Sequence, residues 1–239
     1  MSRKFYIVYI LIDKYRTLED YSWITIKKVL SYYGYKTASR KPKAFKEVVD
    51  ALKFMVNGKM IEIEQELDLD SISYDTGIEI KIIPKYFDHP KSWTRLSATT
   101  FNDLMANDLS VAKENLLLVF LYINSYIGCR KRDDTGKDVM ENPQNSPEAF
   151  YRNLHSMSTD LSMSRETINK CIKYLVDEKI LIKKTVGSVK AWDKAPQNVP
   201  NIYVLNNDRC NQEIEWALNK MKESYKVDLF DETTGGIKK

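Results

Sequence analysis

Residues 157–168 read Met-Ser-Thr-Asp-Leu-Ser-Met-Ser-Arg-Glu-Thr-Ile, and this stretch is the most informative part of the sequence. It predicts the end of one short helix, a tight turn, and the start of a second helix that Ser164 caps. A serine at the N-cap accepts a hydrogen bond from a backbone amide two or three residues further along, and an acid such as Glu166 suits the positive end of the helix dipole. The second helix therefore has a defined start.

The helix that begins after Ser164 has one apolar and one polar face. Its apolar residues follow helical spacing, at positions i, i+3, i+4, i+7 and i+8; they are Ile168, Cys171, Ile172, Leu175 and Val176. After Asp177 the pattern changes to that of a strand over residues 180–186, and a polar loop that contains Gly187 leads to a second strand over residues 201–205. The sequence therefore predicts two helices joined by a turn and followed by a two-stranded hairpin.

These residues resemble a known DNA-binding module. Leu161–Ile168, continued by Lys173–Leu181, looks like the winged helix-turn-helix of bacterial regulators and of replication initiators of plasmids, phages and related mobile elements of Gram-positive bacteria. Pro200–Leu205 is similar to the last wing strand of those initiators. Ser162 replaces the small residue usual in the turn, and the insertion Gly128–Pro147 is longer than the minimal pattern. The resemblance implies a winged-helix fold that binds double-stranded DNA.

The first half of the sequence repeats the pattern of the second half. A shift of 120 positions aligns residues 48–61 with residues 168–181 without a gap, and pairs Met55 with Leu175. A fixed internal period is typical of a repeated module. The alternative is coincidence, because any two amphipathic helices share apolar spacing. We expect a mainly α fold with small β-hairpins (α+β), built as tandem winged helix-turn-helix domains.

The predicted domain boundaries follow from this repeat and from the polar segments around it. Residues 1–90 are predicted to form an N-terminal winged-helix-like domain, a degenerate copy with an acidic wing, and residues 109–206 the C-terminal DNA-binding domain. Residues 91–108 are expected to be a linker, because the segment is polar and follows two prolines. Residues 207–239 are expected to hold a helix, 211–225, whose apolar stripe suits docking or dimer formation, and then a frayed tail.

Composition is typical of a soluble globular protein. Apolar residues make up 43% and charged residues 29%, which permits a packed core and argues against disorder. No apolar run has the length of a transmembrane helix, and no signal-peptide cleavage site follows the basic N-terminus. The three cysteines, Cys129, Cys171 and Cys210, are far apart and odd in number, so neither a disulfide framework nor a metal clip is expected. We expect a cytoplasmic protein without membrane contact.

The second helix of the C-terminal module carries the side chains expected to contact DNA. In a helix-turn-helix this helix enters the major groove, and its N-terminal residues reach the base edges. Arginine can bond guanine through two hydrogen bonds and asparagine can bond adenine likewise, so Arg165 and Asn169 are the predicted sequence readers. The predicted site also includes Ser164, Thr167 and Lys170 on the helix, and Lys183, Lys184 and Lys190 on the wing. Lys173 lies farther along the helix and is expected to contact phosphate. For each lysine the alternative is an ordinary solvated side chain.

Charge is segregated in the first copy. Arg40, Lys41, Lys43 and Lys46 cluster around the start of the equivalent helix and are a candidate phosphate clamp. Residues 62–79, by contrast, contain seven acids and no base. Because a phosphate backbone repels carboxylates, this wing is expected to avoid DNA and to contact a protein, another subunit or the basic surface of the second copy. The first copy is expected to bind DNA by its helix alone or not at all.

The sequence carries no recognisable enzymatic motif. Its two histidines, His89 and His155, form no HExxH or paired-histidine motif, and neither a phosphate-binding loop nor a GxSxG elbow occurs. We expect no catalysis, no cofactor and no metal. The predicted function is sequence-specific binding of double-stranded DNA, with replication initiation of a plasmid, phage or mobile element as the first hypothesis. The alternatives are a transcriptional regulator and a protein-interaction module of replication machinery, and host replication proteins and a second copy of the chain are the further partners considered.

Overall fold

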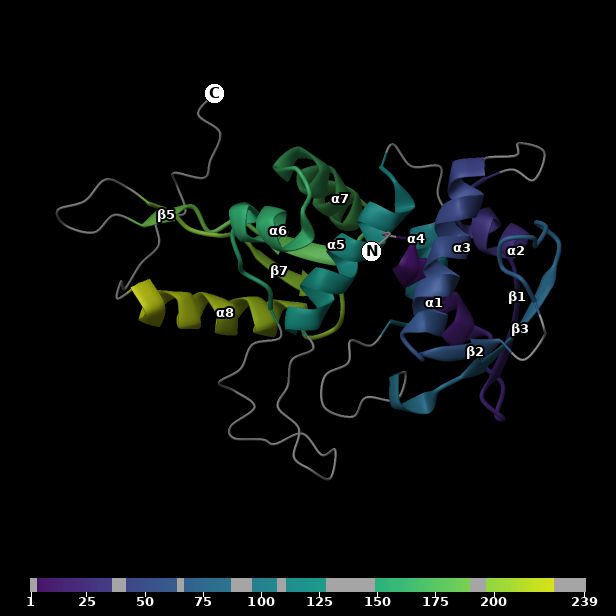
Figure 1. Ribbon diagram of the computed structural model, residues 1–239. Helices are drawn as coiled ribbons and strands as arrows, with labels where there is room; N and C mark the ends of the chain where they lie inside the picture. Colours follow the sequence, from purple (N-terminus) through teal and green to yellow (C-terminus); the bar gives the residue numbers. More distant parts are fainter. Residues whose placement is uncertain are drawn as a thin grey trace. The chain divides into compact units, whose positions relative to one another are not determined.

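The computed structural model describes residues 4–35, 42–63, 67–86, 96–106, 111–127, 149–189 and 197–225. Within them the fold is mixed α+β, with eight α-helices and small antiparallel sheets (Figure 1). The chain divides into two compact units: unit 1 comprises Met1–Pro90 and Leu96–Leu118, and unit 2 comprises Lys91–Arg95 and Val119–Lys239. In the part of the chain described, every helix is too short or too polar to span a lipid bilayer.

Unit 1 combines helices with a three-stranded antiparallel sheet. The strands β1 (Tyr21–Thr25), β3 (Gly77–Ile82) and β2 (Ile61–Ile63) are hydrogen-bonded in that order. The other elements are α1 (Phe5–Lys14), α2 (Ile26–Tyr32), α3 (Pro42–Asn57), the 3-10 turn η1 (Pro84–Tyr86), α4 (Ala98–Ala106) and the first part of α5 (Lys113–Ile127). Alternate side chains of β3 are buried, as the period of a strand with one covered face requires.

A buried lysine joins several segments of unit 1. Only 4% of Lys4 is exposed. Its Nζ lies 3.2 Å from a carboxylate oxygen of Glu47 on α3, 3.5 Å from one of Glu114 on α5, and 4.3 Å from the ring centre of Tyr33. The Tyr33 hydroxyl donates a hydrogen bond to the backbone oxygen of Lys4 at 3.1 Å. The ammonium group can be buried here because two carboxylates and an aromatic ring replace its water.

Unit 2 contains the two helices and the hairpin that the sequence predicts. α6 (Leu154–Leu161) and α7 (Arg165–Asp177) are followed by β4 (Leu181–Lys184), which pairs antiparallel with β7 (Ile202–Leu205). A shorter antiparallel pair, β5 (Ser188–Val189) and β6 (Gln197–Asn198), lies between them in the sequence. The second part of α5 and a last helix, α8 (Cys210–Tyr225), complete the unit.

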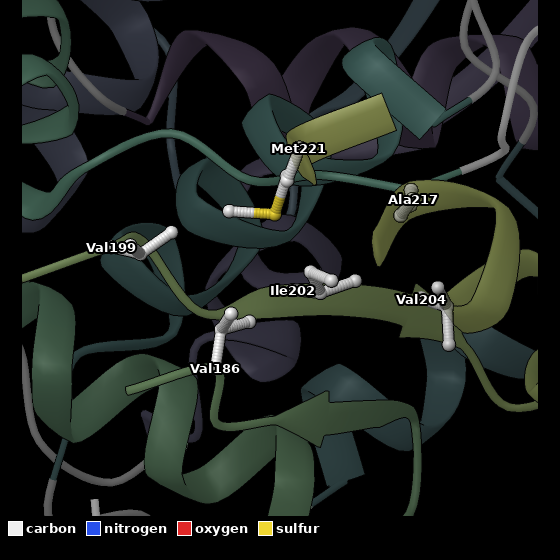
Figure 2. Packing of buried hydrophobic residues seen from close by; sticks show 7 residues of the cluster. Val186, Val199, Ile202, Val204, Ala217 and Met221 are labelled. Atoms are coloured by element: carbon white, nitrogen blue, oxygen red, sulfur yellow. The ribbon is translucent and has the colours of Figure 1, made fainter. Parts of the chain in front are cut away.

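α8 packs on the hairpin of unit 2. It contacts β7 (Figure 1), and Figure 2 shows the side chain of Met221 directed toward Ile202 of that strand. Ile214 and Leu218 of α8 are partly buried against the same cluster. The apolar stripe predicted for residues 211–225 thus packs against the hairpin of unit 2. The buried members of the cluster are Ala149, Val186, Val199, Ile202, Val204, Ala217 and Met221.

α3 of unit 1 and α7 of unit 2 end in the same way. Lys59, after α3, and Lys179, after α7, both adopt the left-handed conformation, with φ of +53° and +57°. Three amides in each unit then donate to carbonyls of the last helical turn, with partners shifted by 120 positions. The pairs are Gly58 to Phe54 and Glu178 to Tyr174, Lys59 to Val56 and Lys179 to Val176, and Met60 to Met55 and Ile180 to Leu175. The aligned segments therefore share one backbone geometry.

The two units also match in the segments that precede α3 and α7, where equivalent residues lie 128 positions apart. Thr25 and Asn153 cap α2 and α6, each by accepting the amide three residues further along. Gly34 and Ser162 follow the ends of these helices in the left-handed conformation. β1, which pairs with β3 in unit 1, has its counterpart in a single β-bridge to β7 in unit 2. Both units thus repeat one order of elements.

Replacing Lys179 with glycine is expected to stabilise unit 2 by about 0.5 kcal/mol. The left-handed conformation strains lysine but not glycine, and this strain exceeds the extra chain entropy that glycine loses on folding. Lys59→Gly is expected to stabilise unit 1 by a similar amount. Chemical denaturation of the full chain measures both changes. The control, Lys170→Gly in the interior of α7, is expected to lose about 1 kcal/mol. A loss of stability in both test variants would contradict the strained ending.

Some predicted boundaries differ from the structure. The expected linker, residues 91–108, contains α4, in which Phe101, Leu104 and Met105 are buried. Their i, i+3, i+4 spacing is a helical signal, but it is short and the surrounding residues are polar. α5 begins at Lys113, and its residues up to Leu118 belong to unit 1 rather than to the domain predicted from residue 109.

Candidate nucleic-acid interface

The turn between α6 and α7 is held by local hydrogen bonds. Ser162 adopts a φ of +50°, and the Ser158 hydroxyl donates to the backbone oxygen of Met163 at 2.6 Å. Ser164 caps α7 as predicted: its hydroxyl accepts the amide of Thr167 at 3.1 Å, and the hydroxyls of the two residues lie 2.9 Å apart. Ser164 and Thr167, both predicted to contact DNA, are therefore engaged in starting the helix.

α7 exposes a polar face away from its buried residues. Arg165, Asn169, Lys170 and Lys173 are exposed, in agreement with their position away from the apolar stripe. Burial raises the pKa of the Cys171 thiol to about 12, so this cysteine acts as a core residue rather than as a reactive group. The buried residues of α7 are Ile168, Cys171, Ile172 and Leu175. The helix therefore offers one arginine, one asparagine and two lysines to solvent.

Both lysines of this face are paired with acids of the same helix. Lys170 lies 2.8 Å from Glu166, and Lys173 lies 2.7 Å from Asp177. The hydrogen bond from Lys170, together with its charge, lowers the pKa of Glu166. These pairs are absent from the sequence-based prediction, although the i, i+4 spacing of opposite charges indicates them. Because the acids offset the lysines, the face is only weakly basic.

Arg165 contacts a histidine of the preceding helix. Its Nη2 lies 2.9 Å from Nδ1 of His155, in the first turn of α6. Both side chains are exposed. The sequence assigns no role to His155, because no spacing rule joins two residues ten positions apart across a turn.

A group of polar side chains fastens α6 to α5. Arg152 donates to the hydroxyls of Tyr122 and Tyr126 at 3.0 and 2.6 Å, and to a carboxylate oxygen of Asp160 on α6 at 3.0 Å. The Tyr122 hydroxyl donates to the same oxygen at 2.5 Å. Burial, reinforced by this bond, raises the pKa of Tyr122. The network fixes α6, and so the start of the turn, relative to α5.

Among the described residues, the hairpin of unit 2 adds one exposed lysine of the predicted set. Lys183 on β4 is exposed and stands opposite Tyr203 in the register with β7. Its neighbour Lys184 is partly buried. Lys190 lies outside the described residues, so the structure does not bear on its predicted role.

The equivalent face of α3 in unit 1 differs in both chemistry and exposure. Phe45 lies with its ring centre 4.6 Å from that of Tyr74, which belongs to the loop between β2 and β3. Val49 is buried, and Lys53 forms an ion pair with Asp70 of the same loop. This loop therefore covers part of the face. The shift of 120 positions gives the equivalent pairs Phe45 and Arg165, Val49 and Asn169, and Lys53 and Lys173.

Three of the acids that the structure describes in the unit 1 hairpin pair with lysines of their own unit. Asp75 lies 2.8 Å from Lys27, and Glu62 lies 3.9 Å from Lys81. Together with the pairing of Asp70 with Lys53, these contacts partly neutralise the acidic segment. Of the predicted phosphate clamp, Lys43 and Lys46 are exposed on α3, whereas Arg40 and Lys41 lie outside the described residues.

No protein-family model matches the sequence, and no curated protein is significantly similar to it. Among the described side chains, no three histidines, cysteines or acids gather in a way that could hold a metal ion.

Proposed function

We propose that the chain is a sequence-specific double-stranded DNA-binding protein that reads DNA through a winged helix-turn-helix in unit 2. In this proposal α6 and α7 are the helix-turn-helix, β4 and β7 are the wing, and Arg165 and Asn169 read bases. The observation that carries it is the exposed polar face of α7, which begins directly after the Ser164 cap. The first residues of such a helix are those that reach base edges when it lies in the major groove.

Unit 1 has the same order of elements, but we do not assign base reading to it. Its equivalent helix face carries Phe45 and Val49 in place of an arginine and an asparagine. The β2–β3 loop engages this face through Tyr74 and Asp70. A groove-reading helix needs accessible hydrogen-bonding side chains, which favours unit 2 as the reader.

The biological process that we propose is initiation of replication of a plasmid, phage or mobile element. The repeated order of elements and the likeness of Pro200–Leu205 to the last wing strand of initiators support it. A plasmid whose origin is replaced by the gene and its flanking DNA is expected to replicate in a Gram-positive host, and to fail with Arg165→Ala. Repression of a neighbouring promoter without replication would identify a transcriptional regulator instead.

Arg165→Ala and Asn169→Ala are each expected to lower discrimination between the best duplex and its single-base-pair variants by about tenfold. The best duplex is first selected from a randomised double-stranded pool with the natural chain. Alanine favours helix, so α7 should persist in both variants. The matched control is Lys46→Ala, an exposed change on α3 that should leave discrimination unaltered. Unchanged discrimination in both test variants would rule out α7 as the reading helix.

A further inference from the structure

The contact between Arg165 and His155 has a defined chemistry. A guanidinium group has only N–H donors, so the imidazole Nδ1 must be the acceptor of the 2.9 Å hydrogen bond. This hydrogen bond therefore requires the tautomer of His155 that carries its proton on Nε2. Within the described part of the chain, His155 is the hydrogen-bond partner of Arg165, and no carboxylate lies at ion-pair distance from that guanidinium.

A neutral acceptor suits an arginine that must later bind a base. Arginine side chains lose considerable rotamer freedom when they are fixed, and a partner that orients the group beforehand removes part of that cost from binding. A carboxylate would hold the guanidinium more tightly and cancel its charge, whereas an imidazole leaves the charge intact. The bond uses Nη2 and leaves further guanidinium donors for a base edge.

We propose that His155 is a positioning residue for base reading: it holds the Arg165 guanidinium in the orientation in which it meets DNA, and so sets the discrimination that Arg165 provides. This inference rests on the proposed function, because it assigns a task to the same site. His155 acts through Arg165 and does not itself contact the base. The Ser164 cap fixes the backbone at Arg165. A partner can therefore restrict only the orientation of the Arg165 side chain.

The experiment compares His155→Ala with His155→Gln in the full chain, using the duplex selected from a randomised double-stranded pool and its single-base-pair variants. His155→Ala is expected to lower discrimination at the base pair read by Arg165 by about 3- to 10-fold, because one hydrogen bond is lost. His155→Gln retains a side-chain acceptor and is expected to restore it. In the Arg165→Ala background, His155→Ala is expected to change nothing further.

The outcomes separate the inference from the function on which it rests. Failure of the natural chain to bind any duplex of the pool would overturn both. If Arg165→Ala loses discrimination while His155→Ala keeps it, the positioning role is wrong and DNA reading stands. An equal effect of His155→Ala with and without Arg165 would also overturn the inference, because His155 would then act independently. A merely structural role predicts equal weakening of all duplexes and no rescue by glutamine.

Discussion

Replacing Lys4 with methionine is expected to lower the free energy of unfolding of unit 1 by about 3 kcal/mol. Methionine preserves most of the volume of the side chain but removes its charge. The carboxylates of Glu47 and Glu114, both partly buried, would then lie near each other without the ammonium group that lies 3.2 and 3.5 Å from them. Chemical denaturation, with hydrogen exchange of the amides of α1 and α3 to resolve unit 1, measures the loss.

Lys27→Met is the matched control, because Lys27 also pairs with an acid of unit 1, at 2.8 Å, but at the surface. An exposed pair contributes about 1 kcal/mol or less. If Lys4→Met costs no more than this control, the buried lysine does not hold the segments of unit 1 together.

The pH dependence of stability tests the same contact. Burial by itself lowers the pKa of Lys4, but the charges of Glu114, Tyr35 and Glu47 outweigh it and the pKa is raised. Burial raises the pKa of Tyr33, and Glu114 reinforces the shift. Both groups hold their protons more tightly in the folded state, so their stabilisation is complete below about pH 10 and is lost as the pH rises further. The natural chain should lose more stability than Lys4→Met over this range.

Features of unit 2 that depend on neighbouring residues could be predicted from the sequence. The Ser164 cap, the buried stripe that includes Ile168 and Leu175, and the change to a strand after Asp177 all follow from local spacing. Local preference and tertiary packing agree at these positions, which is why periodicity suffices. The left-handed conformation of Lys59 and Lys179 could not be predicted from the sequence, because a lysine, unlike a glycine, does not indicate a positive φ.

Contacts between segments distant in the sequence could not be predicted in this way. The covering of Phe45 by Tyr74 depends on how the loop between β2 and β3 folds back, and no periodic pattern encodes that path. The contact of His155 with Arg165 depends on the angle between two helices across the turn. The pairs formed by Lys170 and Lys173 are different, since their acids stand four positions away and spacing alone indicates them.

Replacing Lys170, Lys173 and Lys183 together with alanine is expected to weaken duplex binding by about 100-fold and to reduce the salt slope of binding by roughly 2 to 3. All three lysines are exposed on α7 and β4. The exposed pairs of Lys170 with Glu166 and of Lys173 with Asp177 would not prevent phosphate binding, because an ion pair at the surface contributes little in water. Dissociation constants of the selected duplex between about 50 and 200 mM salt measure both quantities.

The control for this variant removes the same charge from unit 1, at Lys43 and Lys46 on α3 and Lys81 on β3. It lowers the net charge of the chain equally, so any effect of overall charge on binding is the same in both variants. Phosphate contacts made by unit 2 would be lost in the first variant and kept in the control, whose salt slope should match that of the natural chain. Equal losses in both would mean that DNA is attracted by charge without a defined surface. A loss confined to the control would move the interface to unit 1, where the clamp that includes Lys43 and Lys46 would then be the phosphate-binding site.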